Sequence, residues 1–210
     1  MKRLFFIPVL LVLVVPVWAG NGCRVTIAPD DPAIRYTGSH YITMGASGAS
    51  FQRHSDAVLA RPARILGFNA TKARTTTGVA MRFRTGSHTI NLHFTHALGD
   101  GIENRGSTFA VYEDDQFRST HAFSRARTHL SFSVTSMSPG KMSVFCIALP
   151  NWSRPDFRGL DLDAGEALLP LSLPVPSTYV AFGDSITHGT GQSSTHLTYP
   201  WILADLLGLE

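Results

Sequence analysis

Short segments of alternating apolar and polar residues run through residues 36–149 of this chain, and few folds accept such a pattern. Because successive strand residues point to opposite faces, each segment would bury one face against a core. Turn-forming residues separate the segments at Thr85-Gly86-Ser87 and at Ser138-Pro139-Gly140. No long stretch has helical periodicity, so the pattern predicts an antiparallel β-sandwich with jelly-roll topology. The apolar positions are Val79, Met81 and Phe83, then Ile90, Leu92 and Phe94, then Leu130, Phe132 and Val134, and finally the run at residues 142–149.

The composition changes after Asp163, where one glycine and three prolines fall within a short segment. Proline fixes φ and lacks an N–H, so this segment cannot form a regular helix or a central strand. We therefore predict a β-sandwich domain over residues 20–165 and a linker over residues 166–177. The interrupting residues are Gly165, Pro170, Pro174 and Pro176.

Residues 178–210 have the pattern of the beginning of an α/β domain. Tyr179-Val180-Ala181-Phe182 predicts a brief buried strand, and helical spacing of apolar residues follows, with Pro200 in the first turn and Gly208 at the end. Strand, loop and helix are the order in which an α/β domain begins. One strand and one helix bury too little surface to fold alone, so the chain is expected to be truncated at its C-terminus. The helical positions are Tyr199, Ile202, Leu203 and Leu206.

The N-terminus predicts export. Lys2 and Arg3 precede an apolar run over residues 4–19 that ends in Val17-Trp18-Ala19, which is the pattern of a secretory signal peptide cleaved after Ala19. The run contains two prolines and is shorter than a membrane-spanning helix. We therefore expect residues 1–19 to be a signal peptide, a secreted or periplasmic protein, and no stable membrane anchor after cleavage.

Charge and cysteine content exclude several classes of site. The formal net charge of +3 is spread along the chain without a basic block, so nucleic-acid binding is not predicted. Cys23 and Cys146 could close one disulfide in an oxidising compartment, but Cys146 lies in an apolar run and fits a buried thiol equally well. No CxxC and no histidine pair has metal-ligand spacing, so neither a metal site nor a cofactor is expected.

One motif carries chemistry: Ser185 follows the predicted strand directly, in the sequence Phe182-Gly183-Asp184-Ser185-Ile186-Thr187-His188-Gly189. A tight loop there would hold the hydroxyl above the edge of a sheet, where a nucleophile needs to be. A serine hydroxyl also requires a base and preorganised oxyanion donors. Gly183 allows a close backbone turn, the Ser185 amide could be one such donor, and the Asp184 side chain is expected to fix the loop.

Together with the strand before it and the helix opening at Thr198-Tyr199-Pro200, this motif resembles the first conserved block of the SGNH, or GDSL-like, serine hydrolase family. Upstream segments around residues 78–85, 109–112, 142–150 and 160–165 are similar to the β-sandwich that precedes the catalytic domain in some of these esterases. In those relatives the middle strand often ends in a small turn, here at Glu113-Asp114-Asp115.

The resemblance implies an enzyme that hydrolyses carboxylic esters, such as acetylated carbohydrates, through an acyl-serine at Ser185, with the Ser185 amide as oxyanion donor and Gly183 and Asp184 in support. The family's second and third donors, a later glycine and asparagine, and its catalytic histidine are absent from this chain, so the chain as given is expected to be inactive alone.

Two alternatives stay open. His188 or His196 could replace the missing base, although a general base needs hydrogen-bonding geometry and an orienting partner. The chain could also be a non-catalytic carbohydrate-binding or structural β-sandwich. Trp152 and Tyr112 would be candidate sugar platforms, although a buried aromatic is the more common state.

Overall fold

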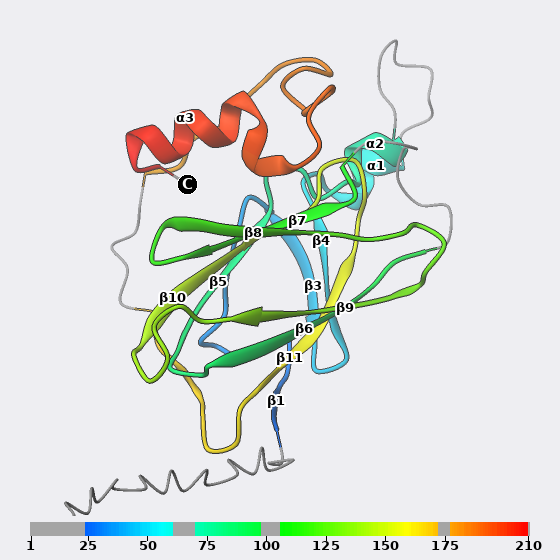
Figure 1. Ribbon diagram of the computed structural model, residues 1–210. Helices are drawn as coiled ribbons and strands as arrows, with labels where there is room; N and C mark the ends of the chain where they lie inside the picture. Colours follow the sequence, from blue (N-terminus) through cyan, green and yellow to red (C-terminus); the bar gives the residue numbers. More distant parts are fainter. Residues whose placement is uncertain (1–23, 61–69, 98–105, 172–176, 210) are drawn as a thin grey trace, which may run out of the picture.

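The computed structural model describes residues 24–60, 70–97, 106–171 and 177–209. Within these ranges the strands form two antiparallel sheets that pack face to face, so the predicted sandwich is confirmed (Figure 1). The predicted signal peptide at residues 1–19 and Cys23 lie outside the described residues. The pairing of Cys23 with Cys146 therefore stays open.

The first sheet has six strands in the order β3-β4-β11-β6-β9, with β1 also pairing with β11. Alternate residues of its long strands are buried: along β6 every second side chain faces the other sheet. This is the period-2 burial that the sequence predicted. The bounds are β1 Val25–Ile27, β3 Tyr41–Gly45, β4 Gly48–Gln52, β6 Thr89–Thr95, β9 His129–Thr135 and β11 Asp156–Leu162.

The second sheet also has six strands, in the order β12-β5-β10-β7-β8, with β2 pairing with β5. Its central strand, β10, is buried along most of its length because its outer face is also covered in part. The bounds are β2 Arg35–Thr37, β5 Ala80–Thr85, β7 Thr108–Glu113, β8 Gln116–Ala122, β10 Ser143–Ala148 and β12 Leu168–Leu169.

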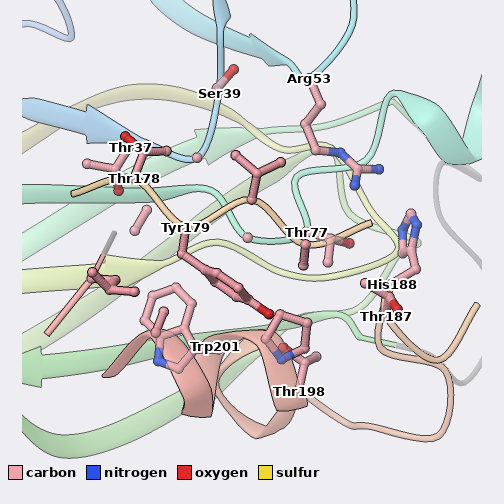
Figure 2. Close-up of a pocket in the computed structure, with 18 of the residues that line it drawn as sticks. Thr37, Ser39, Arg53, Thr77, Thr178, Tyr179, Thr187, His188, Thr198 and Trp201 are labelled. Carbon is pink, nitrogen blue, oxygen red and sulfur yellow. The ribbon is translucent and has the colours of Figure 1, made fainter. Parts of the chain in front are cut away.

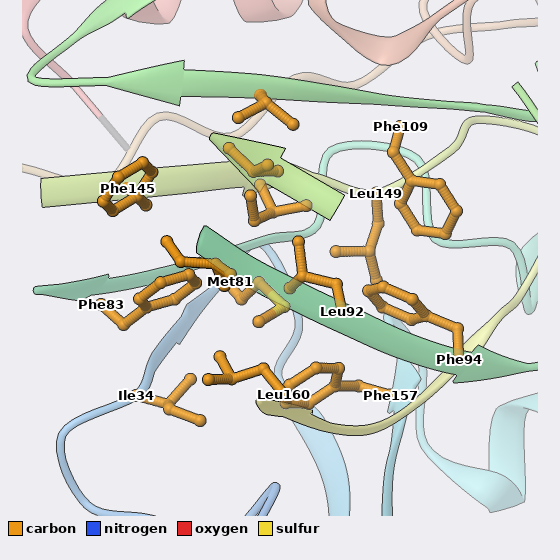
Figure 3. Close-up of a cluster of buried hydrophobic side chains, with 14 of the residues drawn as sticks. Ile34, Met81, Phe83, Leu92, Phe94, Phe109, Phe145, Leu149, Phe157 and Leu160 are labelled. Carbon is orange, nitrogen blue, oxygen red and sulfur yellow. The ribbon is translucent and has the colours of Figure 1, made fainter. Parts of the chain in front are cut away.

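From β4 to β11 along the sequence, the chain crosses repeatedly from one sheet to the other. The first sheet therefore contains the strand order β4-β11-β6-β9 and the second the order β5-β10-β7-β8. This is the strand order of a jelly roll. Between the sheets lies one cluster of buried side chains, in which Phe94 contacts Phe109 at a ring-centroid distance of 4.5 Å and Phe157 at 5.2 Å (Figure 3). Burial of such aromatic and aliphatic area is the main force that joins the two sheets.

The β7–β8 hairpin contains the predicted turn. Asp114 and Asp115 have φ values of 50° and 60°, and Glu113 pairs with Gln116 across them. Two consecutive left-handed residues make the hairpin turn whose twist matches that of the strands. The Asp114 carboxylate accepts the amide of Val144 at 2.8 Å, which ties the turn to β10.

The predicted linker begins inside the sandwich. Leu168 and Leu169 form β12 and pair with Thr85 and Arg84 of β5, so the sandwich extends beyond residue 165. Sequence reasoning assigned these leucines to the linker because Gly165 and Pro170 flank them closely. An edge strand of two residues needs few backbone hydrogen bonds, so it fits between such breakers. Residues 172–176 of the linker lie outside the described residues.

The helix predicted in residues 178–210 is confirmed, whereas the strand is not formed. α3 spans Tyr199–Leu207, has Pro200 in its first turn and ends at Gly208 with φ of 62°. Residues 179–182 are not assigned to a strand, and Phe182 is 89% exposed. A strand exists only when a neighbour accepts and donates its backbone hydrogen bonds, and no described segment pairs with these residues.

Three further short elements complete the described structure: α1 Asp56–Leu59, α2 Ala70–Ala73 and the 3₁₀ helix η1 Thr195–Leu197. η1 and α3 lie beside β7 and β8 on one side of the sandwich (Figure 1). No helix in the described part of the chain combines the length and apolar character needed to cross a membrane.

Candidate active site at the Ser185 loop

Ser185 lies on a compact loop, residues 183–194, which we call the nucleophile loop after the role predicted for Ser185. The Asp184 carboxylate accepts the amide of Ile186 at 2.9 Å, and the Asp184 carbonyl accepts the amide of His188 at 3.1 Å. The Ser185 carbonyl accepts the amide of Thr190 at 2.8 Å. The Asp184 side chain thus holds the loop, as its sequence position suggested, and the Ser185 side chain is exposed.

Gly183 has no room for a side chain, because a Cβ atom there would collide with the Thr187 side chain. The Thr187 hydroxyl in turn lies 2.7 Å from the Tyr199 hydroxyl at the start of α3. Gly183 therefore permits the close turn that presents Ser185, and α3 supports the same turn from the other side.

Asn151 fastens the nucleophile loop to the sandwich. Its fully buried side chain donates from Nδ2 to the carbonyls of Gly189 at 3.3 Å and Gln192 at 3.4 Å. Gly189 has a φ of 98°, and a Cβ atom there would lie 2.7 Å from Asn151 Nδ2. Just beyond the loop, the buried Thr195 hydroxyl donates to the Leu149 carbonyl at 2.6 Å. Buried hydrogen bonds of this kind are costly to break, so the loop is held in one position.

His188 makes the second set of contacts between the loop and the sandwich. Its ring stacks on Trp152 at 4.0 Å, and its Nε2 lies 2.8 Å from Thr75 Oγ1. The Thr75 hydroxyl donates its proton to the Lys72 carbonyl at 2.9 Å, so we assign Nε2 of His188 as the donor to Thr75. Trp152 is 1% exposed and has a φ of 63°, a conformation that bulky residues rarely adopt.

The surroundings of His188 make it a weak base. Burial, followed by the positive charges of Arg53 and Lys72, lowers its pKa from 6.5 to about 4. Ser185 makes no side-chain hydrogen bond to His188 or to His196 within the described ranges; His196 bonds Ser194 Oγ at 2.9 Å and stacks on Phe117. Neither histidine has the geometry of a base for Ser185.

A cavity of about 1200 Å³ lies between the sandwich and residues 178–209 (Figure 2). Ser185 is among the residues that line it. Its walls come from β2, β5, the ends of β4 and α2, the nucleophile loop and α3. The cavity is therefore bounded by both parts of the chain. Tyr112 is half-buried beside Trp201, with ring centroids 6.0 Å apart. With Trp152 buried under His188, neither proposed sugar platform is a freely exposed ring.

Sequence reasoning predicted a turn at Gly183, Asp184 and Ser185 but missed the residues of the sandwich that hold this loop, namely Thr75 and Asn151. No local signal marks them, because Thr75 and His188 are 113 positions apart in the chain. Among the described residues, no group of three or more histidine, cysteine or carboxylate side chains is placed to hold a metal ion.

No family model and no curated protein matches this sequence. Solved structures do match its fold. The salicylyl-acyltransferase SsfX3 from a tetracycline biosynthetic pathway aligns with a TM-score of 0.73 and 21% identity over 89% of this chain and 52% of its own. A family two carbohydrate esterase from Cellvibrio japonicus aligns with a TM-score of 0.62 and 15% identity over 90% of this chain and 51% of its own.

A structure from Bacteroides ovatus described as a GDSL-like lipase aligns with a TM-score of 0.61 and 15% identity, over 82% of this chain and 53% of its own. The chain thus spans about half the length of the solved structures that it matches. At these identities the likeness concerns the fold. The chain shares that fold with proteins that include an acyltransferase, a GDSL-like lipase and an esterase.

Proposed function

We propose that this chain provides the sandwich and the nucleophile loop of an exported SGNH-type serine esterase, with Ser185 as the nucleophile. The observation that carries the proposal is the loop itself: Ser185 is exposed beside a cavity, on a turn that Asp184 folds and Asn151 anchors. An exposed serine on a loop that is held by buried hydrogen bonds is suited to nucleophilic attack, because the loop needs little reorganisation during the reaction. The shared fold with esterases supports the same reading.

In the proposed reaction, Ser185 Oγ forms a bond to the acyl carbon while the ester C–O bond breaks. The serine proton passes through a base to the departing alkoxide, which leaves as an alcohol. Water then attacks the acyl-serine, releases the carboxylic acid and restores the serine hydroxyl. We propose the Ser185 amide as one oxyanion donor.

By the family resemblance, the base is a histidine of an Asp-x-x-His element, and a glycine and an asparagine donate further hydrogen bonds to the oxyanion. No Asp-x-x-His element occurs in these 210 residues. We therefore propose that the complete site needs polypeptide in addition to these residues, and that acyl groups as small as acetyl, on a carbohydrate or another alcohol, are its substrates.

The test compares the full native protein, its length established by intact mass, with Ser185→Ala and with Ser193→Ala. Ser193 is an exposed serine of the same loop and serves as the matched control. We expect hydrolysis of p-nitrophenyl acetate to fall by on the order of 10³-fold or more in S185A and to be unchanged in S193A. The 210-residue chain by itself is expected to hydrolyse the ester at little more than the background rate.

A mass increase of one acyl group on Ser185, trapped at low pH, would identify the intermediate. Full hydrolytic activity in S185A would overturn the proposal. Retention of carbohydrate binding without any hydrolysis by the native protein would instead favour the non-catalytic alternative.

A further inference from the structure

Basic side chains gather on one wall of the cavity that Ser185 lines. Arg53 follows β4, Lys72 lies in α2 and His188 lies in the nucleophile loop, so three segments distant in sequence bring them together. Figure 2 shows the Arg53 guanidinium and the His188 ring on the same side of the cavity. Thr75 connects them, because its hydroxyl oxygen lies 3.3 Å from Arg53 Nη2 and 2.8 Å from His188 Nε2.

The positive charge of Arg53 has no acidic counterpart in the described structure. Its Nη2 donates to two neutral oxygens, the Lys72 carbonyl at 3.2 Å and the Thr75 hydroxyl. Within the described ranges, no carboxylate lies at ion-pair distance from Arg53. Three aspartates line the cavity. Asp115 lies 3.2 Å from Arg82 Nη1, Asp184 accepts an amide of its own loop, and Asp205 lies in α3. Burial and then the charge of Asp205 raise the pKa of Tyr112.

The lowered pKa values of two neighbouring histidines indicate the same excess of positive charge. Burial and the charge of Arg53 lower the pKa of His54, and burial, Arg53 and Lys72 lower the pKa of His188 to about 4. Both histidines are therefore neutral at pH 7, whereas the guanidinium stays charged even where burial lowers its pKa. The resting charge of this wall comes from Arg53 and Lys72.

A partly buried arginine with neutral partners binds an oxyanion strongly, because the guanidinium presents paired N–H donors and the low dielectric strengthens the attraction. We propose that Arg53 and Lys72 bind an anionic group, a carboxylate, phosphate or sulfate, on the ester that Ser185 attacks. This assignment of substrate class rests on the proposed function. The anion would lie against the wall formed by Arg53, Lys72 and the edge of the His188 ring, within the same cavity as the nucleophile.

The experiment measures binding, so that it does not depend on turnover. Glucuronate, glucose 6-phosphate, glucose 6-sulfate and neutral glucose are titrated into the 210-residue chain while ¹H–¹⁵N spectra follow the Arg53 Nε–H and the His188 ring. We expect the anionic sugars to shift both signals, to raise the pKa of His188 above its resting value and to bind more weakly as salt increases. Comparing the three anions identifies which oxyacid is preferred, and neutral glucose should have no effect.

Charge-removing variants locate the site. Lys72→Gln and Arg53→Gln should each weaken anion binding by about tenfold, whereas Arg127→Gln, an exposed arginine in another loop, should bind like the wild type. Lys72 is exposed, so K72Q tests the site even where R53Q disturbs the anchoring of α2. R53K, which keeps the charge but loses the paired donors, should bind between R53Q and the wild type.

Ser185→Ala should bind the anions unchanged, which separates this inference from the proposed function. Loss of hydrolysis in S185A with intact anion binding supports both. Equal binding of glucose and glucuronate, or wild-type affinity in both R53Q and K72Q, would overturn the anionic-substrate proposal and leave the assignment of Ser185 untouched.

Discussion

His188 is half-buried between Trp152 and Thr75, and this partial burial favours the neutral imidazole. Its protonation would place a third positive charge beside Arg53 and Lys72 in a site that is already desolvated, which explains the pKa of about 4. At the scale of single residues, His188 is thus a structural side chain that holds the nucleophile loop. Its position three residues after Ser185 suggested a catalytic role that its partners do not support.

This environment predicts a pH dependence of stability. The pKa of His188 is lower in the folded protein than the unfolded value of 6.5, so the unfolded chain binds a proton first as the pH falls. The contribution is complete above about pH 6.5 and is lost between there and about pH 4, with a size of roughly 2–3 kcal/mol. Chemical unfolding at pH 7.5, 5.5 and 4.5 measures it.

The control for this pH dependence is His188→Gln, which cannot titrate. Other histidines with a lowered pKa, such as His54, His121 and His196, titrate in both proteins. Only the difference in the pH dependence of stability between the wild type and H188Q therefore measures the contribution of His188. H188Q should lose less stability on acidification than the wild type does. Parallel pH profiles would show that His188 does not titrate as its surroundings indicate.

At the scale of elements, the nucleophile loop is held by the turn after β10 as well as by its own hydrogen bonds. Asn151 bonds two loop carbonyls, Leu149 accepts the Thr195 hydroxyl, and Trp152 stacks on His188. One short segment of the sandwich thus contacts the second half of the loop and Thr195, which follows it. The sandwich therefore holds the loop that carries Ser185, the proposed nucleophile.

Asn151→Ala should release this loop. Loss of the side-chain amide leaves the buried Gly189 carbonyl and the partly buried Gln192 carbonyl without their donor, which costs about 1–3 kcal/mol. Amide hydrogen exchange in residues 186–192 should quicken while exchange in β6 stays slow. Asn91→Ala is the matched control, because Asn91 bonds Ser133 at 2.5 Å on the outer face of the first sheet. If N151A and N91A showed the same exchange in the loop, the anchoring role would be refuted.

At the scale of the whole molecule, exposed apolar side chains are concentrated in residues 178–209. Phe182 is 89% exposed and Leu206 77% exposed, with neighbours that are also uncovered, and larger apolar patches of this kind promote association. The further exposed residues in this segment are Val180, Ile186, Leu197, Tyr199, Ile202, Leu203 and Leu207. The same segment contains residues 179–182, which do not pair with any strand of the described structure.

Replacing Phe182 and Leu206 together by lysine should reduce self-association of the chain and its binding of an apolar dye. The free energy of unfolding should change by no more than about 0.5 kcal/mol, because both side chains are exposed in the folded state. Sedimentation across a concentration series and dye fluorescence are the measurements. Met137→Lys, at a position 67% exposed in a turn of the sandwich, is the control and should leave association unchanged.

Much of the architecture is encoded locally. The alternation in β5, β6 and β9, the turn residues between them and the helix spacing of α3 all operate over a few positions, so they could be predicted from the residues. The turn at Gly183, Asp184 and Ser185 could be predicted for the same reason, because the residue types that a tight turn requires are adjacent in sequence.

Features that depend on the path of the chain could not be foreseen. The contacts of His188 with Thr75 and of Asn151 with Gly189 join residues 113 and 38 positions apart, and their existence depends on the strand order of the jelly roll. The basic wall of the cavity arises in the same way from three separate segments. Residues 179–182 show the opposite case, in which a local pattern predicts an element that does not form. Their apolar pattern predicts a strand, but a strand forms only where a neighbouring backbone completes its hydrogen bonds.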